Sequence, residues 1–180
     1  EYDNPLLIEN EKNLIKNDLN YAYSRIKHKR EFDDELDGFA FDEVIKKGSE
    51  EQIKSLKLPK NASQSLELIK RFEKDSLKLD ASEYESLVSM VNFDEKAYLE
   101  IAKLSIKKLD PDALIGIFKR LKNTQIEALR AYLFILAEFA LFDELKLEIG
   151  NDKKNFNDFK LVLLAREKNI KIDLYNLIQW

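Results

Sequence analysis

The sequence contains no cysteine, one histidine, four glycines and three prolines in 180 residues. Without cysteine it forms no disulfide, thiolate nucleophile or thiolate metal site, and one histidine is too few for a multi-histidine site. So little glycine and proline argues against collagen-like, turn-rich all-β and low-complexity chains, and favours long uninterrupted helices. The composition therefore predicts an all-α protein with a core of ordinary size, because a chain of this length buries roughly 70% of its unfolded surface.

Motifs for nucleotide and hydrolase chemistry are also missing. The four glycines are isolated, so neither the P-loop nor the dinucleotide-binding glycine pattern can be built. The single histidine, His28, lies in the basic stretch "RIKHKR". The sequence has no G-x-S-x-G nucleophile motif with which this histidine could form a catalytic triad. We therefore expect a protein that is not an enzyme and has no cofactor.

Long hydrophobic runs are absent as well. The longest apolar stretch is residues 131–142, twelve residues in which Glu138 alone is not apolar. A membrane helix needs roughly 18 to 20 consecutive apolar residues, so no transmembrane segment is expected in this chain. The chain begins at Glu1 rather than methionine, which leaves open an anchor or signal peptide upstream. Together with the lack of cysteine, this favours an exported or membrane-anchored protein over a cytoplasmic one.

Positive charge is in the minority. The net charge is -4 and the isoelectric point is near 5.3. No general positive field attracts a phosphate backbone, so we expect no nucleic-acid partner and instead expect another protein. Oligomeric state is not indicated by the sequence.

The hydrophobic spacing predicts helices along the whole chain. One long amphipathic helix is expected from Asn4-Pro5 to about Lys29, followed by an acidic loop over residues 31–43. This suggests a segment 1–38 and a helical domain 39–180, with the first helix packed on it. Ser49 and Gln52 form a capping-box pattern at a helix start.

The second half predicts helices from residues 80, 94 and 110, and one long helix over about 125–149. The starts at Asp80 and Asp110 lie thirty residues apart, a spacing that hints at stacked helical hairpins. The expected fold has seven to nine helices in an irregular bundle or a short, α-solenoid-like stack of helical hairpins.

Glu138 is the most unusual candidate for a functional residue. Its neighbours one helical turn away, which include Phe134 and Leu141, are large and apolar. The simplest interpretation is a central helix whose carboxylate reaches the surface or pairs with a cation; the others are a partner-binding apolar patch or a catalytic acid. A partner-binding surface is hypothesised at Phe134, Glu138, Leu141 and the C-terminal Trp180, since tryptophan is enriched at binding hot spots.

The pattern Asp33-x-Glu35-x-Asp37-Gly38 is the candidate for a metal site. A calcium-binding EF-hand loop alternates oxygen ligands in this way and has glycine at its sixth position. The twelfth position, which requires glutamate, is Val44. A solvated acidic loop is therefore favoured over a calcium site, with Asp33, Glu35 and Asp37 as weak metal-ligand candidates.

Three functions follow from these observations. The first is a non-catalytic protein-interaction or scaffold domain of a larger, exported or membrane-anchored protein. The second is an exported helical surface protein that binds host or envelope components. The third is a metal-dependent switch or enzyme that uses carboxylates.

Overall fold

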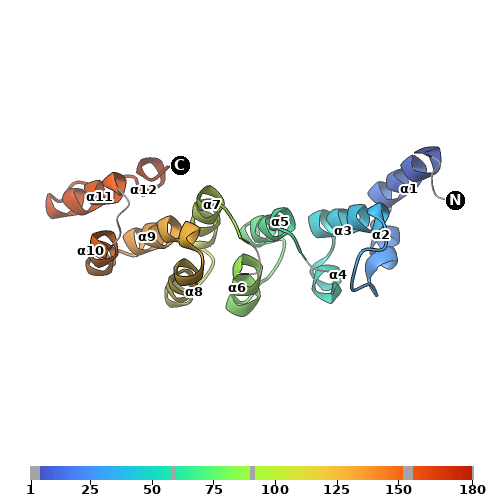
Figure 1. Ribbon diagram of the computed structural model, residues 1–180, viewed down its shortest axis with the longest axis horizontal. Helices are drawn as coiled ribbons and strands as arrows, with labels where there is room; N and C mark the ends of the chain where they lie inside the picture. Colours follow the sequence, from blue (N-terminus) through green and yellow to red (C-terminus); the bar gives the residue numbers. More distant parts are fainter. Residues whose placement is uncertain (1–4, 58–59, 90–91, 152–155, 180) are drawn as a thin grey trace. The chain divides into compact units, whose positions relative to one another are not determined.

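The protein is an all-α multi-helix bundle. The structure is a computed structural model, which describes residues 5–57, 60–89, 92–151 and 156–179. Every regular element in these ranges is a helix, which confirms the predicted fold class (Figure 1). The helices group into two compact units, Glu1–Leu79 and Asp80–Trp180. The described ranges hold more helices than the seven to nine predicted, partly because both predicted long helices are broken.

In the first unit, the third helix packs against the other four helices. The helices of its described residues are α1 (Pro5–Asn17), α2 (Leu19–Ile26), α3 (Glu35–Lys47), α4 (Glu50–Ser55) and α5 (Ala62–Glu73). Helix α3 contacts α1, α2, α4 and α5. The largest fully buried side chains are Ile15, Ile26, Phe41, Ile45, Leu68 and Ile69. The first helical segment is therefore packed on the elements that follow it.

The predicted single helix from Asn4 to Lys29 is wrong, because the chain breaks at Asp18. The backbone of Asp18 is extended, with φ -123° and ψ 97°, and its carboxylate accepts a hydrogen bond from the N–H of Tyr21 at 3.0 Å. A short polar side chain competes in this way for backbone groups and starts a new helix. As a result α2 packs beside α1.

The predicted acidic loop over 31–43 is also largely helical. Asp34 caps α3 by accepting a hydrogen bond from the N–H of Asp37 at 2.8 Å, and the helix begins at Glu35. Carboxylates in a first turn are favoured by the helix dipole, so an acidic run is compatible with a helix start. The division suggested after residue 38 falls inside α3. The capping box of Ser49 and Gln52 is confirmed.

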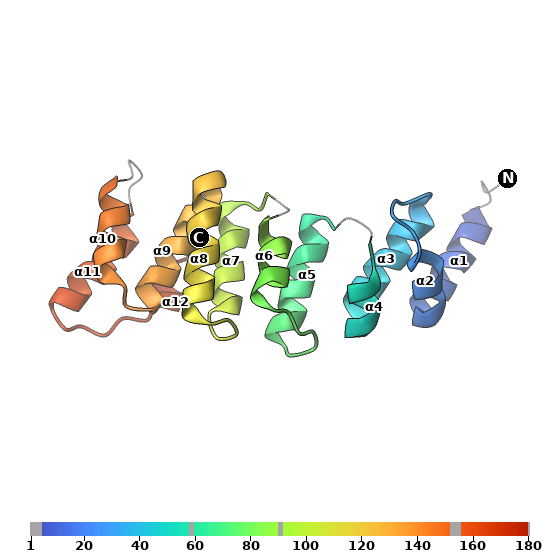
Figure 2. The ribbon, with the colours of Figure 1, turned by 90° about the horizontal axis from the view of Figure 1, so that it is seen from below.

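In the second unit, alternate helices pack on one another. Its described helices are α6 (Ala81–Ser89), α7 (Glu95–Ser105), α8 (Pro111–Thr124), the 3-10 turn η1 (Ile126–Ala128), α9 (Leu129–Glu138), α10 (Phe142–Asn151), α11 (Asn157–Glu167) and α12 (Leu174–Leu177). Helix α6 contacts α8, and α7 contacts α9 (Figures 1 and 2). Helix α9 also contacts α8, α10, α11 and α12, so it forms the centre of this unit.

The predicted helix over 125–149 is wrong, because α9 and α10 are separate. Ala140 is left-handed, with φ 57°, and the N–H of Leu141 donates to the carbonyl of Leu136 at 2.9 Å. This bond is typical of a Schellman helix end, in which glycine usually occupies the left-handed position. No glycine or proline marks the position, so the local sequence does not account for the break. It brings the ring of Phe142 to the side of α9 that faces α11.

None of the helices in the described ranges is both long enough and apolar enough to cross a bilayer.

Candidate functional site

Helix α9 is largely buried, and the helices α10, α11 and α12 pack against it. All side chains from Ala131 to Ala137 are buried. Phe134 is fully buried, and its ring lies edge-on to that of Tyr175 in α12, with 5.3 Å between centroids. Phe134 therefore has no exposed surface in this structure and packs against α12, and its role in partner binding stays a prediction. The core-helix interpretation of α9 is confirmed.

Glu138 lies at the C-terminal end of α9, near the start of α12. Its side chain is partly exposed. Burial raises the pKa of the Glu138 carboxyl, and the nearby charge of Asp173 raises it further, while Lys107 lowers it. Asp173 is the N-cap of α12 and accepts hydrogen bonds from the N–H groups of Tyr175 and Asn176. A role for Glu138 in partner binding stays a prediction.

The other two hypothesised binding residues have different outcomes. Leu141 is partly exposed and lies in the turn between α9 and α10. Its role in binding also stays a prediction. Trp180 lies outside the described residues.

The three metal-ligand candidates do not form a metal site. Asp37 is fully buried and accepts hydrogen bonds from Arg25 Nε at 2.8 Å and from the ammonium of Lys29. Asp33 also pairs with Lys29 at 2.7 Å, whereas Glu35 pairs with Lys12 at 2.5 Å. The carboxylates thus face cations of α1, α2 and the turn that follows α2. Across the described ranges, no three acidic, histidine or cysteine side chains cluster to hold a metal.

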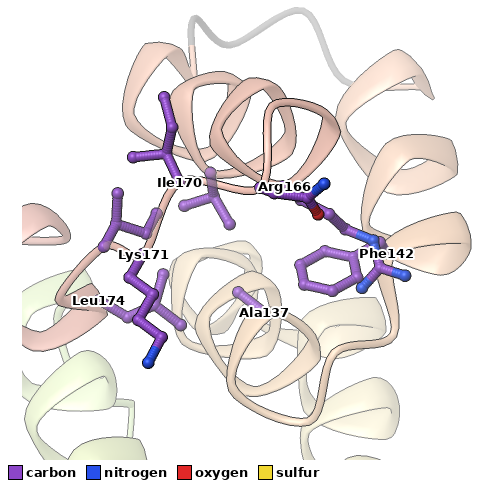
Figure 3. A pocket seen from close by; sticks show the side chains of 9 residues that line it. Ala137, Phe142, Arg166, Ile170, Lys171 and Leu174 are labelled. Atoms are coloured by element: carbon purple, nitrogen blue, oxygen red, sulfur yellow. The ribbon is translucent and has the colours of Figure 1, made fainter.

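A groove in the second unit is the strongest candidate for a functional site. It encloses about 540 Å³ beside α9, α11 and the segment between α11 and α12. Its lining consists of Ala137, Phe142, Val162, Arg166, Asn169, Ile170, Lys171, Ile172 and Leu174. We call this the C-terminal groove. In Figure 3, Ile170, Lys171 and Leu174 lie on one side, and Phe142 with Arg166 on the other, with Ala137 between them.

Apolar side chains in the groove are open to solvent. Ile170 is 56% exposed and Ile172 is 38% exposed, although both are large and β-branched. They lie in a run from Arg166 to Asp173 in which every residue is exposed. Single exposed apolar residues are ordinary, but two that line one hollow are typical of a binding surface.

Two cations border the same groove. The guanidinium of Arg166 lies 4.0 Å from the centre of the Phe142 ring, a cation-π contact that limits its motion. Lys171 is exposed on the other side. Neither side chain forms an ion pair with a carboxylate in the described part of the chain. The groove therefore combines open apolar surface with positive charge that no carboxylate among the described residues pairs with.

The backbone that forms one wall of the groove is fixed by a helix end. Asn169 is left-handed, with φ 54°, a conformation that asparagine tolerates better than most residues. The N–H of Ile170 then donates to the carbonyl of Ala165 at 2.8 Å and closes the end of α11. This turn carries the chain across the groove to α12.

The groove was not predicted from the sequence. Leu141 and Trp180 were named as binding residues, but Ile170, Ile172, Arg166 and Lys171 were not. The available signal was the segment Asn169–Ile172, where two isoleucines alternate with a lysine after a residue that favours helix ends. Comparison of the chain with protein-family models, curated proteins and solved structures gives no match in any of the three.

Proposed function

We propose that this protein is a non-catalytic protein-interaction domain whose C-terminal groove binds a segment of another protein. The observation that carries the proposal is that exposed Ile170 and Ile172 lie beside Arg166 and Lys171, two cations without an ion pair to any described carboxylate. The matching occupant presents an apolar side chain flanked by carboxylates. Burial of the isoleucines supplies a favourable apolar term, and the cations select against basic segments.

The positive charge of the C-terminal groove is local. The whole chain is acidic, with a net charge of -4, so an acidic partner is not attracted to the molecule in general. Binding of such a segment depends on the two groove cations, and its affinity falls as added salt screens them.

Selection from a displayed library of random twelve-residue peptides tests the proposal. The 180-residue chain is the target, and the affinity of enriched peptides is then measured by fluorescence anisotropy. Ile170→Asp is expected to weaken binding at least about tenfold, because it replaces buried apolar contact with a charge that repels the carboxylates. Lys171→Glu is expected to weaken the same peptides.

Two matched controls separate the groove from general surface effects. Leu161→Asp makes the same kind of change at a residue of α11 that is 51% exposed and lies outside the groove lining. Lys168→Glu reverses an exposed charge in the same segment, also outside the lining. Both variants are expected to bind like the wild type. The proposal is overturned if no peptide is enriched, or if the enriched peptides bind the Ile170→Asp variant as well as the wild type.

A further inference from the structure

We propose that the partner segment binds the C-terminal groove in an extended conformation and pairs as a β-strand with the backbone of Ile170–Asp173. This inference rests on the proposed function and adds how the partner is recognised. It identifies the occupant as an extended peptide with apolar and acidic side chains, rather than an amphipathic helix.

The first observation is a short stretch of backbone between α11 and α12 that makes no hydrogen bond with the described part of the chain. After the N–H of Ile170 donates to Ala165, the N–H and carbonyl groups of Lys171 and Ile172 form no hydrogen bond with any described residue. The next backbone bond is accepted by Asp173, from the N–H of Leu177 in α12. Water satisfies these groups while the segment is exposed.

The second observation is that this stretch is held at both ends. Its beginning is fixed by the bond from Ile170 to Ala165, and its end by Asp173, whose extended backbone (φ -90°, ψ 102°) and carboxylate cap α12. Helix α12 is in turn tied to the body of the unit, because Lys103 Nζ donates to the carbonyls of Tyr175 at 3.2 Å and Ile178 at 2.7 Å. A segment fixed in this way loses little conformational freedom when a second strand pairs with it.

Burial of these backbone groups decides between the possible partner conformations. A partner that covers Ile170 and Ile172 also takes water away from the backbone between them. A helical partner uses its own N–H and carbonyl groups internally and leaves those of Lys171 and Ile172 without partners, at a cost per group. An extended partner supplies matching donors and acceptors, as in strand addition to a sheet edge.

The residue types support the same conclusion. Isoleucine has a high strand propensity because its branched side chain packs well on a pleated surface. The sequence Ile170-Lys171-Ile172 therefore suits a paired strand. Carboxylates of the partner would reach Lys171 on one side of the groove and Arg166, which stacks on Phe142, on the other.

Amide exchange followed by NMR tests the mode of binding directly. The probe is the tightest peptide from the library selection, bound to the full 180-residue chain. In the free protein, the amides of Lys171 and Ile172 are expected to exchange rapidly. In the complex, at least one of them is expected to slow by about tenfold or more, because a strand pair bonds alternate backbone amides.

N-methylation of the peptide provides the second readout. Successive residues of a strand direct their amides to opposite sides, so methylation at one set of alternate positions should weaken binding about tenfold. Methylation at the other set should leave the affinity within about twofold. The Leu161→Asp variant serves as the control and should respond to both sets like the wild type.

The outcomes separate the two proposals. If peptides bind in an Ile170-dependent manner but neither methylated set nor the exchange of Lys171 and Ile172 changes, strand pairing is overturned and the interaction function stands. Enriched peptides with apolar residues at helical spacing overturn it in the same way. If no Ile170-dependent peptide exists, the proposed function itself fails.

Discussion

Asp37 shows how a buried charge is stabilised in the first unit. Its side chain has no exposed surface and lies at the start of α3. Burial acts to raise the pKa of the Asp37 carboxyl, but hydrogen bonds from Lys29 and from the N–H of Asp33, with the charge of Arg25, lower the pKa below its usual range. The carboxylate therefore joins α2, the turn that follows it and α3 through one charged centre.

Asp37→Asn is expected to lower the free energy of unfolding by about 3 kcal/mol at neutral pH, because Arg25 and Lys29 lose a buried partner. Because folding lowers the pKa of Asp37, its ionised carboxylate stabilises the fold at pH values above the unfolded pKa of 3.8. This contribution to stability is lost as the pH falls through the pKa of Asp37 in the folded protein. The difference between variant and wild type should thus shrink in acid. Urea unfolding followed by circular dichroism at pH 7 and pH 3 measures it.

The matched control is Asp33→Asn, which removes the more exposed carboxylate paired with the same lysine. An exposed pair of this kind contributes less than about 1 kcal/mol. Equal losses at positions 33 and 37 would contradict the central role assigned to Asp37.

Glu138 has the opposite pH dependence. Because its pKa is raised in the fold, the stabilising contribution is complete below the unfolded value of 4.5 and is lost as the pH rises through the folded value. Glu138→Gln is therefore expected to raise the free energy of unfolding at pH 7, by less than about 1 kcal/mol since the group is partly exposed, and to have little effect at pH 4. Thermal unfolding at both pH values measures the difference, with the exposed Glu127→Gln as control. A loss of stability at pH 7 would be the contrary result.

At the scale of elements, α12 is a four-residue helix that depends on α9. Phe134→Ala removes the buried ring against which Tyr175 packs, so the free energy of unfolding of the second unit should fall by about 4 kcal/mol. Amide exchange in α12 should increase more than in α7. Leu147→Ala, at an exposed position of α10, should change stability by no more than about 0.5 kcal/mol. If exchange in α12 is unchanged in the Phe134→Ala variant, its attachment to α9 has another basis.

The all-α class of the fold and several helix starts could be predicted from the sequence, because they depend on local chemistry. The capping box of Ser49 and Gln52 and the start at Asp110-Pro111 are examples. The break at Asp18 was missed, although aspartate is a frequent N-cap, because the apolar spacing continues through it. The break at Ala140 could not have been predicted locally, since alanine is the strongest helix former and adopts φ 57° there.

The groove was beyond prediction for a similar reason. Ile170 and Ile172 are of a residue type that is usually buried in a core, and only the course of the chain after Asn169 leaves them exposed. Phe134, conversely, was expected at a binding surface and is buried because four C-terminal residues fold back as α12. Exposure of an apolar residue depends on which distant element covers it, and spacing along one helix does not contain that information.

At the scale of the whole molecule, the two compact units meet in sequence between Leu79 and Asp80. Residues 1–38 belong with the helices that follow, because α3 contacts α1, α2 and α5. The candidate groove lies within the second unit alone. Charge runs and loop-like composition suggested a division at the acidic stretch, but contacts between helices determine which residues form a unit.

The exposed run from Arg166 to Asp173 also makes the groove susceptible to proteolysis. It contains Arg166, Lys168 and Lys171, after which trypsin cleaves, and proteases act on exposed segments of this kind. A cut after Lys171 separates Ile172 and Leu174 from the rest of the lining and leaves α12 attached only by non-covalent contacts. We expect native trypsin digestion, read by mass spectrometry, to release residues 172–180 and abolish peptide binding, and a bound peptide to slow that cut. The backbone of residues 170–173 would then be both the edge that pairs with the partner and the site at which one cut inactivates binding irreversibly.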